Sequence, residues 1–291
     1  MILTIASGKG GTGKTTLATN LARVASRAGR VVRYLDCDVE EPNGHLFLRP
    51  TVLERRVVTV EIPRVDSTRC TGCGLCGRIC QYHAIVPINR QALVFDRLCH
   101  SCGGCWRVCP ADAITPEPMT IGELEIGRSD DVDVVTGRLR IGFAATPAMI
   151  RGVKEHIGPE GLTILDAPPG TSCPVVASLR GADFVLLTTE PTPFGLHDLT
   201  LAVELVRELG IPFAAAINRD GIGDDRVDRY CSSEGIEILL RLPDDRRIAE
   251  AYSAGRMAVD ALPEYEGLFR ELAETIESRS TGAVSTKGET D

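Results

Sequence analysis

A glycine-rich stretch near the N-terminus, GKGGTGKTT at residues 8–16, constrains the fold more than any other part of the chain. The apolar run at residues 1–6 predicts a buried parallel strand before it, and apolar residues at helical spacing follow it as far as Gly29. A glycine-rich turn between a strand and a helix lets backbone N–H groups surround phosphate oxygens, and the helix N-terminus adds partial positive charge. The strand and helix on either side argue against a chance glycine-rich turn, so the chain is predicted to begin as a phosphate-binding α/β domain.

Two lysines in this loop have different expected roles. Lys14 is expected to reach the β- and γ-phosphates of ATP, and the Thr15 hydroxyl to ligate Mg²⁺. Lys9 is not needed for this phosphate cradle, so its position calls for another explanation. The loop residues predicted to contact ATP are Gly8, Gly10, Gly11, Thr12, Gly13, Lys14, Thr15 and Thr16.

Carboxylates follow two further predicted strands. Asp36 and Asp38 come directly after the strand predicted at 31–35, and Asp166 ends the apolar run that begins at residue 162. Ligands in open α/β sheets collect at the carboxyl ends of the strands. Asp38 is therefore expected to position the attacking water, Asp36 to support Mg²⁺ and Asp166 to hold Mg²⁺ through water.

The base and the γ-phosphate have their own candidate residues. Gly170 follows Asp166 closely and is expected to offer its N–H to the γ-phosphate. Further strands are predicted at 184–188 and 213–217, alternating with helical patterns. Asn218 ends the second of these strands, where it can contact an adenine edge, and residues 242–245 are expected to close the base pocket.

Eight of the eleven cysteines lie in two runs that begin at residues 70 and 99, each with the spacing C-x2-C-x2-C-x3-C. This doubled pattern is typical of a bacterial-type ferredoxin with two [4Fe–4S] clusters, in which the fourth cysteine of each run ligates the other cluster. A pair of zinc sites is the alternative, but those sites usually contain two CxxC pairs separated by a longer loop. The predicted ligand sets are Cys70, Cys73, Cys76 and Cys109 for one cluster, and Cys80, Cys99, Cys102 and Cys105 for the other.

Length and charge exclude several other classes. A chain of 291 residues can hold one large α/β domain and a smaller module. The net charge of −8 argues against a general nucleic-acid-binding surface. No apolar run approaches the roughly 20 residues of a membrane span, and the phosphate loop begins too early for a signal peptide. A cytoplasmic protein with neither nucleic-acid nor membrane partners is expected.

Four stretches, KGGTGKTT, DCDVEEPN, DAPPG and INRD, together resemble the deviant phosphate-loop ATPases of the MinD/ParA/Mrp superfamily. The cysteine runs resemble the members that carry an inserted ferredoxin domain. The resemblance implies an α/β fold with a mostly parallel sheet and an inserted α+β ferredoxin-like module. The implied divisions are an ATPase domain at 1–61 and 119–277, the insert at 62–118 and a disordered tail at 278–291.

The resemblance also accounts for Lys9. In this superfamily the early lysine crosses a two-fold interface to the nucleotide of the partner subunit. Lys9 is thus expected to stabilise the transition state in trans, within an ATP-dependent homodimer.

Three functions are compatible with these motifs. The first is an ATPase coupled to electron transfer through two [4Fe–4S] clusters, the second an iron–sulfur cluster carrier or maturation ATPase, and the third a positioning or regulatory ATPase with a redox-sensing module. Eight cysteines suited to closed ligation favour electron transfer, because a cluster donor needs labile ligands. The partner would be a redox protein or an iron–sulfur target protein that the sequence does not identify.

Overall fold

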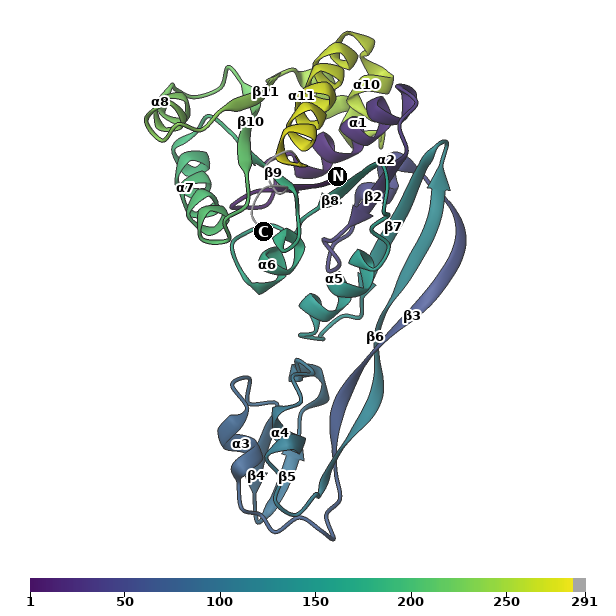
Figure 1. The fold of residues 1–291 in the computed structure, drawn as a ribbon, viewed down its shortest axis with the longest axis vertical. Helices are drawn as coiled ribbons and strands as arrows, with labels where there is room; N and C mark the ends of the chain where they lie inside the picture. The colour runs from purple at the N-terminus through teal and green to yellow at the C-terminus, as the bar shows by residue number, and fades with distance from the viewer. Residues whose placement is uncertain (285–291) are drawn as a thin grey trace.

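A nine-stranded sheet forms the centre of the chain, in the order β11-β10-β9-β1-β8-β2-β7-β6-β3 (Figure 1). The structure is a computed structural model that describes residues 1–284. Neighbouring strands are parallel from β11 to β7, whereas β6 pairs antiparallel with both β7 and β3. The fold is therefore α/β with a mostly parallel sheet, as predicted. The strands of this sheet are β1 Ile2–Ala6, β2 Val32–Asp36, β3 Thr51–Val65, β6 Ile114–Ser129, β7 Val132–Leu139, β8 Leu162–Asp166, β9 Phe184–Thr189, β10 Phe213–Asp220 and β11 Ile238–Pro243.

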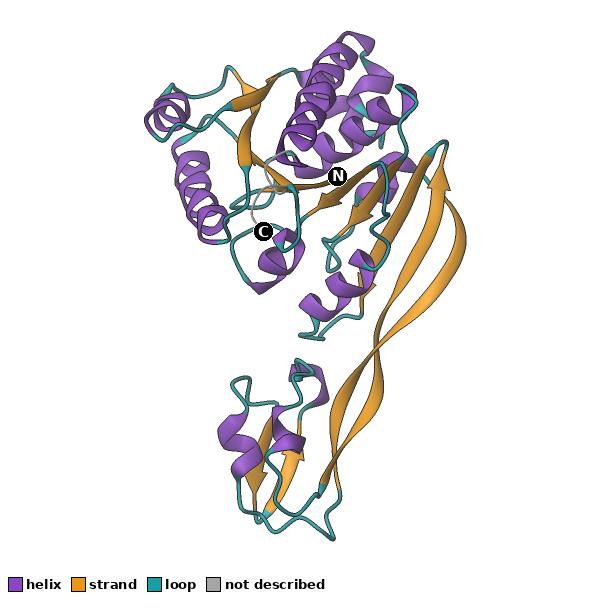
Figure 2. Cartoon of the chain, viewed as in Figure 1, coloured by secondary structure: helices purple, strands orange, loops and turns teal. Residues whose placement is uncertain are grey.

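Helices cover both faces of the sheet (Figure 2). Because side chains alternate along a strand, Leu3 and Ile5 of β1 join the core beneath α1 and α11, whereas Ala6 joins the core beneath α6, α7 and α8. A third cluster of buried residues lies beneath α5. The helices of the body are α1 Lys14–Arg27, α2 Gly44–Leu48, α5 Thr146–Lys154, α6 Cys173–Leu179, α7 Pro193–Glu208, α8 Arg226–Ser233, α9 Arg246–Ser253, α10 Ala258–Ala261 and α11 Glu266–Val284, with a short 3-10 helix, η2, at Pro263–Tyr265.

A long two-stranded ribbon carries the cysteines away from the sheet. Strands β3 and β6 pair from Thr51 with Arg128 to Val65 with Ile114, and the ribbon extends well beyond the helices of the body (Figure 1). We call residues 66–113, which join its two strands, the cysteine module. The module contains α3 Leu75–Ile79, β4 Ile85–Ile88, β5 Gln91–Val94, the 3-10 helix η1 Asp96–Leu98 and α4 Gly104–Arg107.

The strands predicted at 1–6, 31–35, 162–166, 184–188 and 213–217 are confirmed as β1, β2, β8, β9 and β10, with ends that differ by up to three residues. The disordered tail predicted at 278–291 needs correction, because α11 continues to Val284. Residues 285–291 of that prediction lie outside the described part of the chain. None of the helices within residues 1–284 is both long enough and apolar enough to cross a membrane.

Candidate nucleotide site and cysteine module

The phosphate loop joins the end of β1 to the first residue of α1, and two of its glycines cannot carry a side chain. Gly13 has φ 94°, and a Cβ there would lie 2.3 Å from Asn218 Nδ2. A Cβ on Gly8 would lie 2.1 Å from the carbonyl oxygen of Asp198 in α7. The glycine pattern thus reflects close packing of the loop against β10 and α7 as well as its expected approach to phosphate.

Lys14 lies at the start of α1 and is nearly buried. Its Nζ donates to Ser7 Oγ at 3.0 Å and to the carbonyl oxygen of Lys9 at 3.5 Å. Burial lowers the pKa of Lys14, and the Asp166 and Asp38 carboxylates oppose that shift. The ammonium therefore lies between the loop and an acidic group, where it can meet the charge of a bound phosphate.

Asp36 and Asp166 lie side by side at the carboxyl ends of β2 and β8, where they are partners in the strand register. Both are fully buried, and this burial raises the pKa of each carboxyl group. Asp36 accepts hydrogen bonds from the N–H of Asp38 at 3.2 Å and of Gly44 at 3.0 Å. Asp36 thus holds the loop that follows β2 and fixes the backbone of Asp38.

Asp166 has one oxygen engaged and one open. Tyr34 donates its hydroxyl to Asp166 Oδ2 at 2.8 Å. Oδ1 is buried and has no hydrogen bond of normal geometry among the described residues, although the Thr15 side chain lies beside it. Magnesium prefers oxygen ligands and usually keeps several of its waters. An open buried carboxylate oxygen beside the Thr15 hydroxyl fits such an ion.

Asp38 lies at the edge of this acidic group. Burial, and then the nearby Asp166 carboxylate, raise the pKa of Asp38 to about 6, and Lys14 opposes the shift. A carboxyl group with this pKa can accept a proton near neutral pH.

One cavity extends from the phosphate loop to the end of β11. Asn218 lines it, but its Nδ2 donates to the carbonyl oxygen of Thr12 at 2.9 Å, so the amide holds the loop as well as facing the cavity. The predicted base-pocket stretch 242–245 is represented in the lining by Pro243 and the two aspartates that follow it. Of the predicted ATP contacts and catalytic residues, Gly10, Gly11, Gly13, Lys14, Thr15, Thr16, Asp38 and Asn218 line this cavity, whereas Gly8, Lys9, Thr12, Asp36, Asp166 and Gly170 do not.

Gly170 and Lys9 make contacts that the sequence did not predict. The N–H of Gly170 donates to the carbonyl oxygen of Ser7 at 3.0 Å, so contact with a γ-phosphate would require that bond to break. The Nζ of Lys9 lies 4.0 Å from carboxylate oxygens of both Glu190 and Asp198, on the side of the loop that packs against α7. Lys9 is thus directed toward acidic residues of its own chain.

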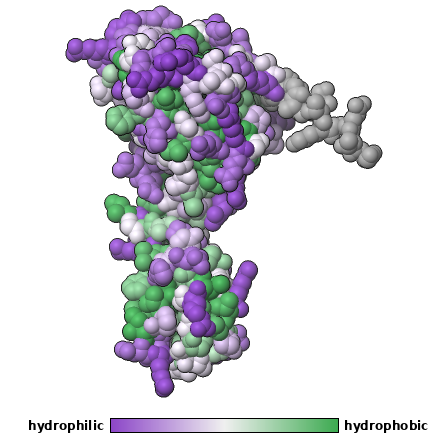
Figure 3. Space-filling view, turned by 90° about the vertical axis from the view of Figure 1, so that its left-hand side faces the viewer, coloured by the Kyte–Doolittle hydropathy of each residue, from purple (hydrophilic) through white to green (hydrophobic). Residues whose placement is uncertain are grey.

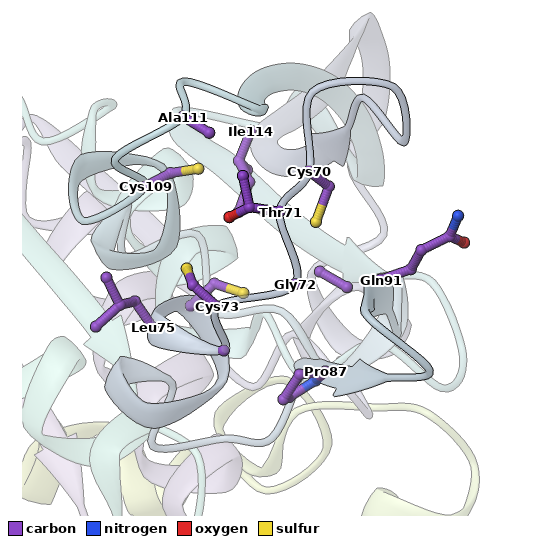
Figure 4. A pocket seen from close by; sticks show the side chains of 13 residues that line it. Cys70, Thr71, Gly72, Cys73, Leu75, Pro87, Gln91, Cys109, Ala111 and Ile114 are labelled. Carbon is purple, nitrogen blue, oxygen red and sulfur yellow. The ribbon is translucent and has the colours of Figure 1, made fainter.

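The eight cysteines of the module surround two separate cavities. Figure 4 shows the sulfur atoms of Cys70, Cys73 and Cys109 around one shared space. The first cavity is lined by Cys70, Cys73, Cys76 and Cys109, and the second by Cys80, Cys99, Cys102 and Cys105. Each cavity therefore combines three cysteines of one run with the last cysteine of the other.

Backbone N–H groups point at several of these sulfur atoms. The N–H of Ala84 donates to Cys80 Sγ at 3.3 Å, and the N–H of Ala113 donates to Cys109 Sγ at the same distance. The two contacts are equivalent, because in each the donor lies four residues after the cysteine that accepts. Such hydrogen bonds stabilise thiolates and adjust the reduction potential of a cluster that they ligate.

One loop of the body contacts the module. The N–H of Ala144, between β7 and α5, donates to the carbonyl oxygen of Arg97 at 2.9 Å, and the Arg97 guanidinium lies 6.0 Å from the centre of the Phe143 ring. At the other end of this loop Thr146 Oγ1 donates to Glu40 Oε1 at 2.6 Å. The loop at 139–146 therefore joins the Asp38 loop to the residues just before Cys99.

Sequence patterns missed Tyr34 and Thr146. Tyr34 lies in β2 and its partner Asp166 is 132 residues away, so no local spacing connects them. A tyrosine at a buried strand position was the available signal, because a buried hydroxyl needs a partner.

Comparison with known proteins identifies the family. The profile of the CobQ/CobB/MinD/ParA nucleotide binding domain matches residues 3–259. The chain belongs to this family. It is a phosphate-loop ATPase of the MinD/ParA type. The septum site-determining protein MinD of Pyrococcus horikoshii, solved with Mg-ADP, shares its fold with a TM-score of 0.61. The two sequences are 21% identical, and the match covers 94% of this chain and 95% of that one.

Two proteins with similar sequences illustrate the relatives of this chain. An uncharacterized protein of Methanocaldococcus jannaschii is 30% identical over 258 residues, which cover 88% of this chain and 90% of that protein. An iron–sulfur cluster carrier protein of Aquifex aeolicus is 23% identical over 306 residues, which cover 96% of this chain and 68% of that protein.

Proposed function

We propose that this ATPase couples the binding and hydrolysis of MgATP to electron transfer through two [4Fe–4S] clusters in the cysteine module. The observation that carries the proposal is the pair of cavities, each lined by four cysteines drawn from both runs. That crossed arrangement is the ligation pattern of two-cluster bacterial ferredoxins. Bound there, the clusters would supply one-electron chemistry.

The geometry of the thiols favours clusters over single zinc ions. In the described part of the chain, no three Cys, His, Asp or Glu side chains come close enough together to hold one metal ion. A cluster of four iron and four sulfide atoms occupies space between its four thiolates, so the sulfur atoms lie far apart. A zinc ion instead needs its four ligand atoms within about 2.3 Å of the metal. Four cysteines around a cavity suit the former.

The nucleotide half of the proposal assigns each group a task. Lys14 would neutralise charge on the β- and γ-phosphates, while Thr15 and the open Oδ1 of Asp166 would hold Mg²⁺, the second through water. Asp36 supports the ion through its buried charge and through the backbone of Asp38. Asp38 orients the attacking water.

Lys9 is proposed to act on the nucleotide of a partner subunit. Its two ion pairs are long, at 4.0 Å, and about a third of its side chain is exposed, so they hold it only weakly. An ATP-dependent homodimer could therefore redirect Lys9 across the interface at small cost. MinD-like ATPases commonly dimerise, which supports this arrangement.

Coupling is proposed to run through the 139–146 loop. Its hydrogen bond to Glu40 lies two residues from Asp38, and its hydrogen bond to Arg97 lies two residues from Cys99. A movement of the Asp38 loop on nucleotide binding would therefore displace the module next to the second cavity. Coupling needs an element of this kind, whose position both sites influence.

A cluster carrier is the second candidate. The relatives named as iron–sulfur cluster carrier proteins favour it, and so does the exposure of one cysteine in each cavity, Cys73 and Cys102. An exposed ligand gives an acceptor protein access to the cluster.

Anaerobic purification tests the cluster assignment. We expect about eight iron and eight sulfide per chain, with absorbance near roughly 400 nm that dithionite bleaches. Cys102→Ala should lose about four of those iron atoms, whereas Cys173→Ala, which removes an exposed cysteine outside the module, should keep all of them. Stoichiometric zinc without a visible chromophore would contradict both candidates.

Linkage then separates electron transfer from cluster transfer. If ATP binding alters the reduction potential, oxidised and reduced protein must bind ATP with different affinities. Thr146→Val, which removes the hydrogen bond to Glu40, should reduce that difference, and Thr200→Val on α7 is the matched control. Equal ATP affinities in the wild type, together with rapid cluster transfer to an apo-ferredoxin, would establish the carrier in place of the electron-transfer ATPase.

A further inference from the structure

The hairpin of β4 and β5 has an apolar outer face. Its register pairs Val86 with Leu93 and Ile88 with Gln91, and the N–H of Phe95 continues the pairing to Ala84. Because side chains alternate along a strand, Leu93 and Phe95 lie on the face opposite to Val94, which packs in the core of the module. Val86 and Ile88 share the outer face with them. A hairpin with an unburied apolar face is unusual for a surface element.

These side chains belong to a marked concentration of exposed apolar residues. Ile88 and Leu93 are each 48% exposed and Phe95 is 43% exposed. Ile79, Tyr82 and Leu98, within the same twenty-residue stretch, are exposed to a similar degree. Figure 3 shows hydrophobic residues gathered on the lobe that corresponds to the module. Exposed apolar side chains that gather on one part of a surface mark binding sites.

The inner face of the same hairpin forms part of the wall of both cavities. Pro87 and Ala92 line the first cavity, and Ile85 lines the second. A protein seated on the outer face would thus be separated from both cysteine sites by a single hairpin layer. Packed sheets lie about 10 Å apart, which sets the scale of that separation.

Apart from its cysteines, the module has more basic than acidic side chains. The module carries five arginines and three aspartates, in a chain whose net charge is −8. The side chains of Arg78, Arg90 and Arg107 make no hydrogen bond or ion pair within residues 1–284, whereas most arginines of the body are paired. Arg90 lies at the hairpin turn, with φ 64° and its backbone packed over Gly72 of the first cysteine run. The apolar face thus has an unpaired cation at its end.

We propose that the outer face of the β4–β5 hairpin is the docking surface for a small acidic electron-carrier protein. An apolar centre with a charged rim is the usual organisation of such interfaces, and electron-transfer encounters bury little surface. Arg90, which has no partner in the described part of the chain and lies at the end of the face, favours an acidic carrier through charge complementarity. In the reaction the module loses one electron and the carrier gains it, with no bond formed or broken. The proposal rests on the proposed electron-transfer function.

A binding titration tests the surface directly. The probe is a fluorescently labelled plant-type ferredoxin, which is acidic, titrated with the anaerobically purified protein at low salt. We expect binding that weakens as salt is added. Arg90→Glu and Leu93→Glu should each weaken it about tenfold or more, and Arg90→Lys should retain most of it.

Matched variants elsewhere control for general effects of charge and polarity. Leu53→Glu changes an apolar side chain on β3 that is 73% exposed, and Arg229→Glu changes an exposed arginine on α8. Both should bind the ferredoxin as the wild type does. Equal affinity of Leu93→Glu and the wild type, or tighter binding of basic cytochrome c than of ferredoxin, would overturn the proposal. A nucleotide-independent dimer that Leu93→Glu dissociates would assign the face to a second copy of this chain instead.

Methyl viologen separates failure of the docking surface from failure of the proposed function. This small dye accepts electrons without a docking site. Protein is reduced with dithionite and freed of the excess reductant before the dye is added. If this protein reduces the dye but shows neither a preference between carriers nor an effect of Leu93→Glu, the docking surface alone is refuted. Protein that contains no iron and transfers no electrons to the dye would refute electron transfer itself.

Discussion

Replacing Tyr34 with phenylalanine removes the hydroxyl that donates to Asp166 Oδ2 at 2.8 Å. Both side chains are buried, and burial together with the neighbouring carboxylates raises the pKa of Tyr34 well above its usual value, so the hydroxyl remains a donor at neutral pH. Without it, both Asp166 oxygens lack a hydrogen bond of normal geometry among the described residues. A hydrogen bond to a charged group contributes about 1.5–3 kcal/mol.

We therefore expect Tyr34→Phe to lower the free energy of unfolding by about 2 kcal/mol, roughly a 30-fold change in the unfolding equilibrium. Urea unfolding of nucleotide-free protein, followed by far-UV circular dichroism, measures this loss. The loss should shrink as pH falls through the raised pKa of Asp166, because the protonated carboxyl no longer carries the charge that the hydroxyl stabilises.

The same substitution should weaken the binding of Mg²⁺. Tyr34 fixes the carboxylate so that Oδ1 stays beside Thr15, and loss of a residue that orients a metal ligand typically weakens metal affinity 10–100-fold. ATPase rates measured against Mg²⁺ concentration give this affinity. In an Asp166→Asn background the effect of Tyr34→Phe on both stability and Mg²⁺ should largely disappear. Unchanged stability and unchanged Mg²⁺ dependence in Tyr34→Phe would refute the role of this hydrogen bond.

Three other substitutions test the catalytic assignments. The rate of ATP hydrolysis should fall as pH drops below about 6, the pKa of Asp38, and Asp38→Asn should bind ATP but hydrolyse it slowly at every pH. Because this pKa exceeds the usual 3.8, the native state binds the proton more tightly, so Asp38 should also make stability fall as pH rises from about 4 to 6. Lys14→Ala should abolish ATP binding, whereas Lys9→Ala should bind ATP and lose most hydrolysis. A mixed dimer of the two variants should recover up to about half of the wild-type rate if Lys9 acts in trans, and none if it acts in cis.

Contiguous patterns account for the parts of the fold that the sequence predicts. The buried strands β1, β2, β8, β9 and β10 are apolar runs bounded by turn residues, and each follows or precedes a helical pattern. Strand β3 gives no such signal, because its first seven residues are exposed and its pairing residues lie far along the chain, as Arg55 and Glu125 do at 70 residues. The ribbon is therefore specified by long-range pairing, which local periodicity does not report.

The candidate site likewise combines features that local sequence spacing predicts with features that only tertiary contacts determine. The spacing of the cysteines is local, and the two cavities group them as that spacing predicts. Tertiary contacts determine the rest: Asn218 holds the carbonyl oxygen of Thr12, Gly170 donates to Ser7, and Lys9 faces acidic residues near α7. Each of these partners lies in a distant segment of the chain, so no single motif could contain both members of a pair.

The strength of the contact between body and module suits a coupling role. At the 139–146 loop it includes a backbone hydrogen bond from Ala144 to Arg97 and the approach of the Arg97 guanidinium to the Phe143 ring. Such contacts contribute about 0.5–1.5 and 0.5–1 kcal/mol, respectively. Their sum is comparable with the roughly 1–3 kcal/mol by which one ligand usually alters the affinity of a distant site for another. A stronger contact would fix the module in both nucleotide states, and without any contact the ribbon alone would leave nucleotide and redox state independent.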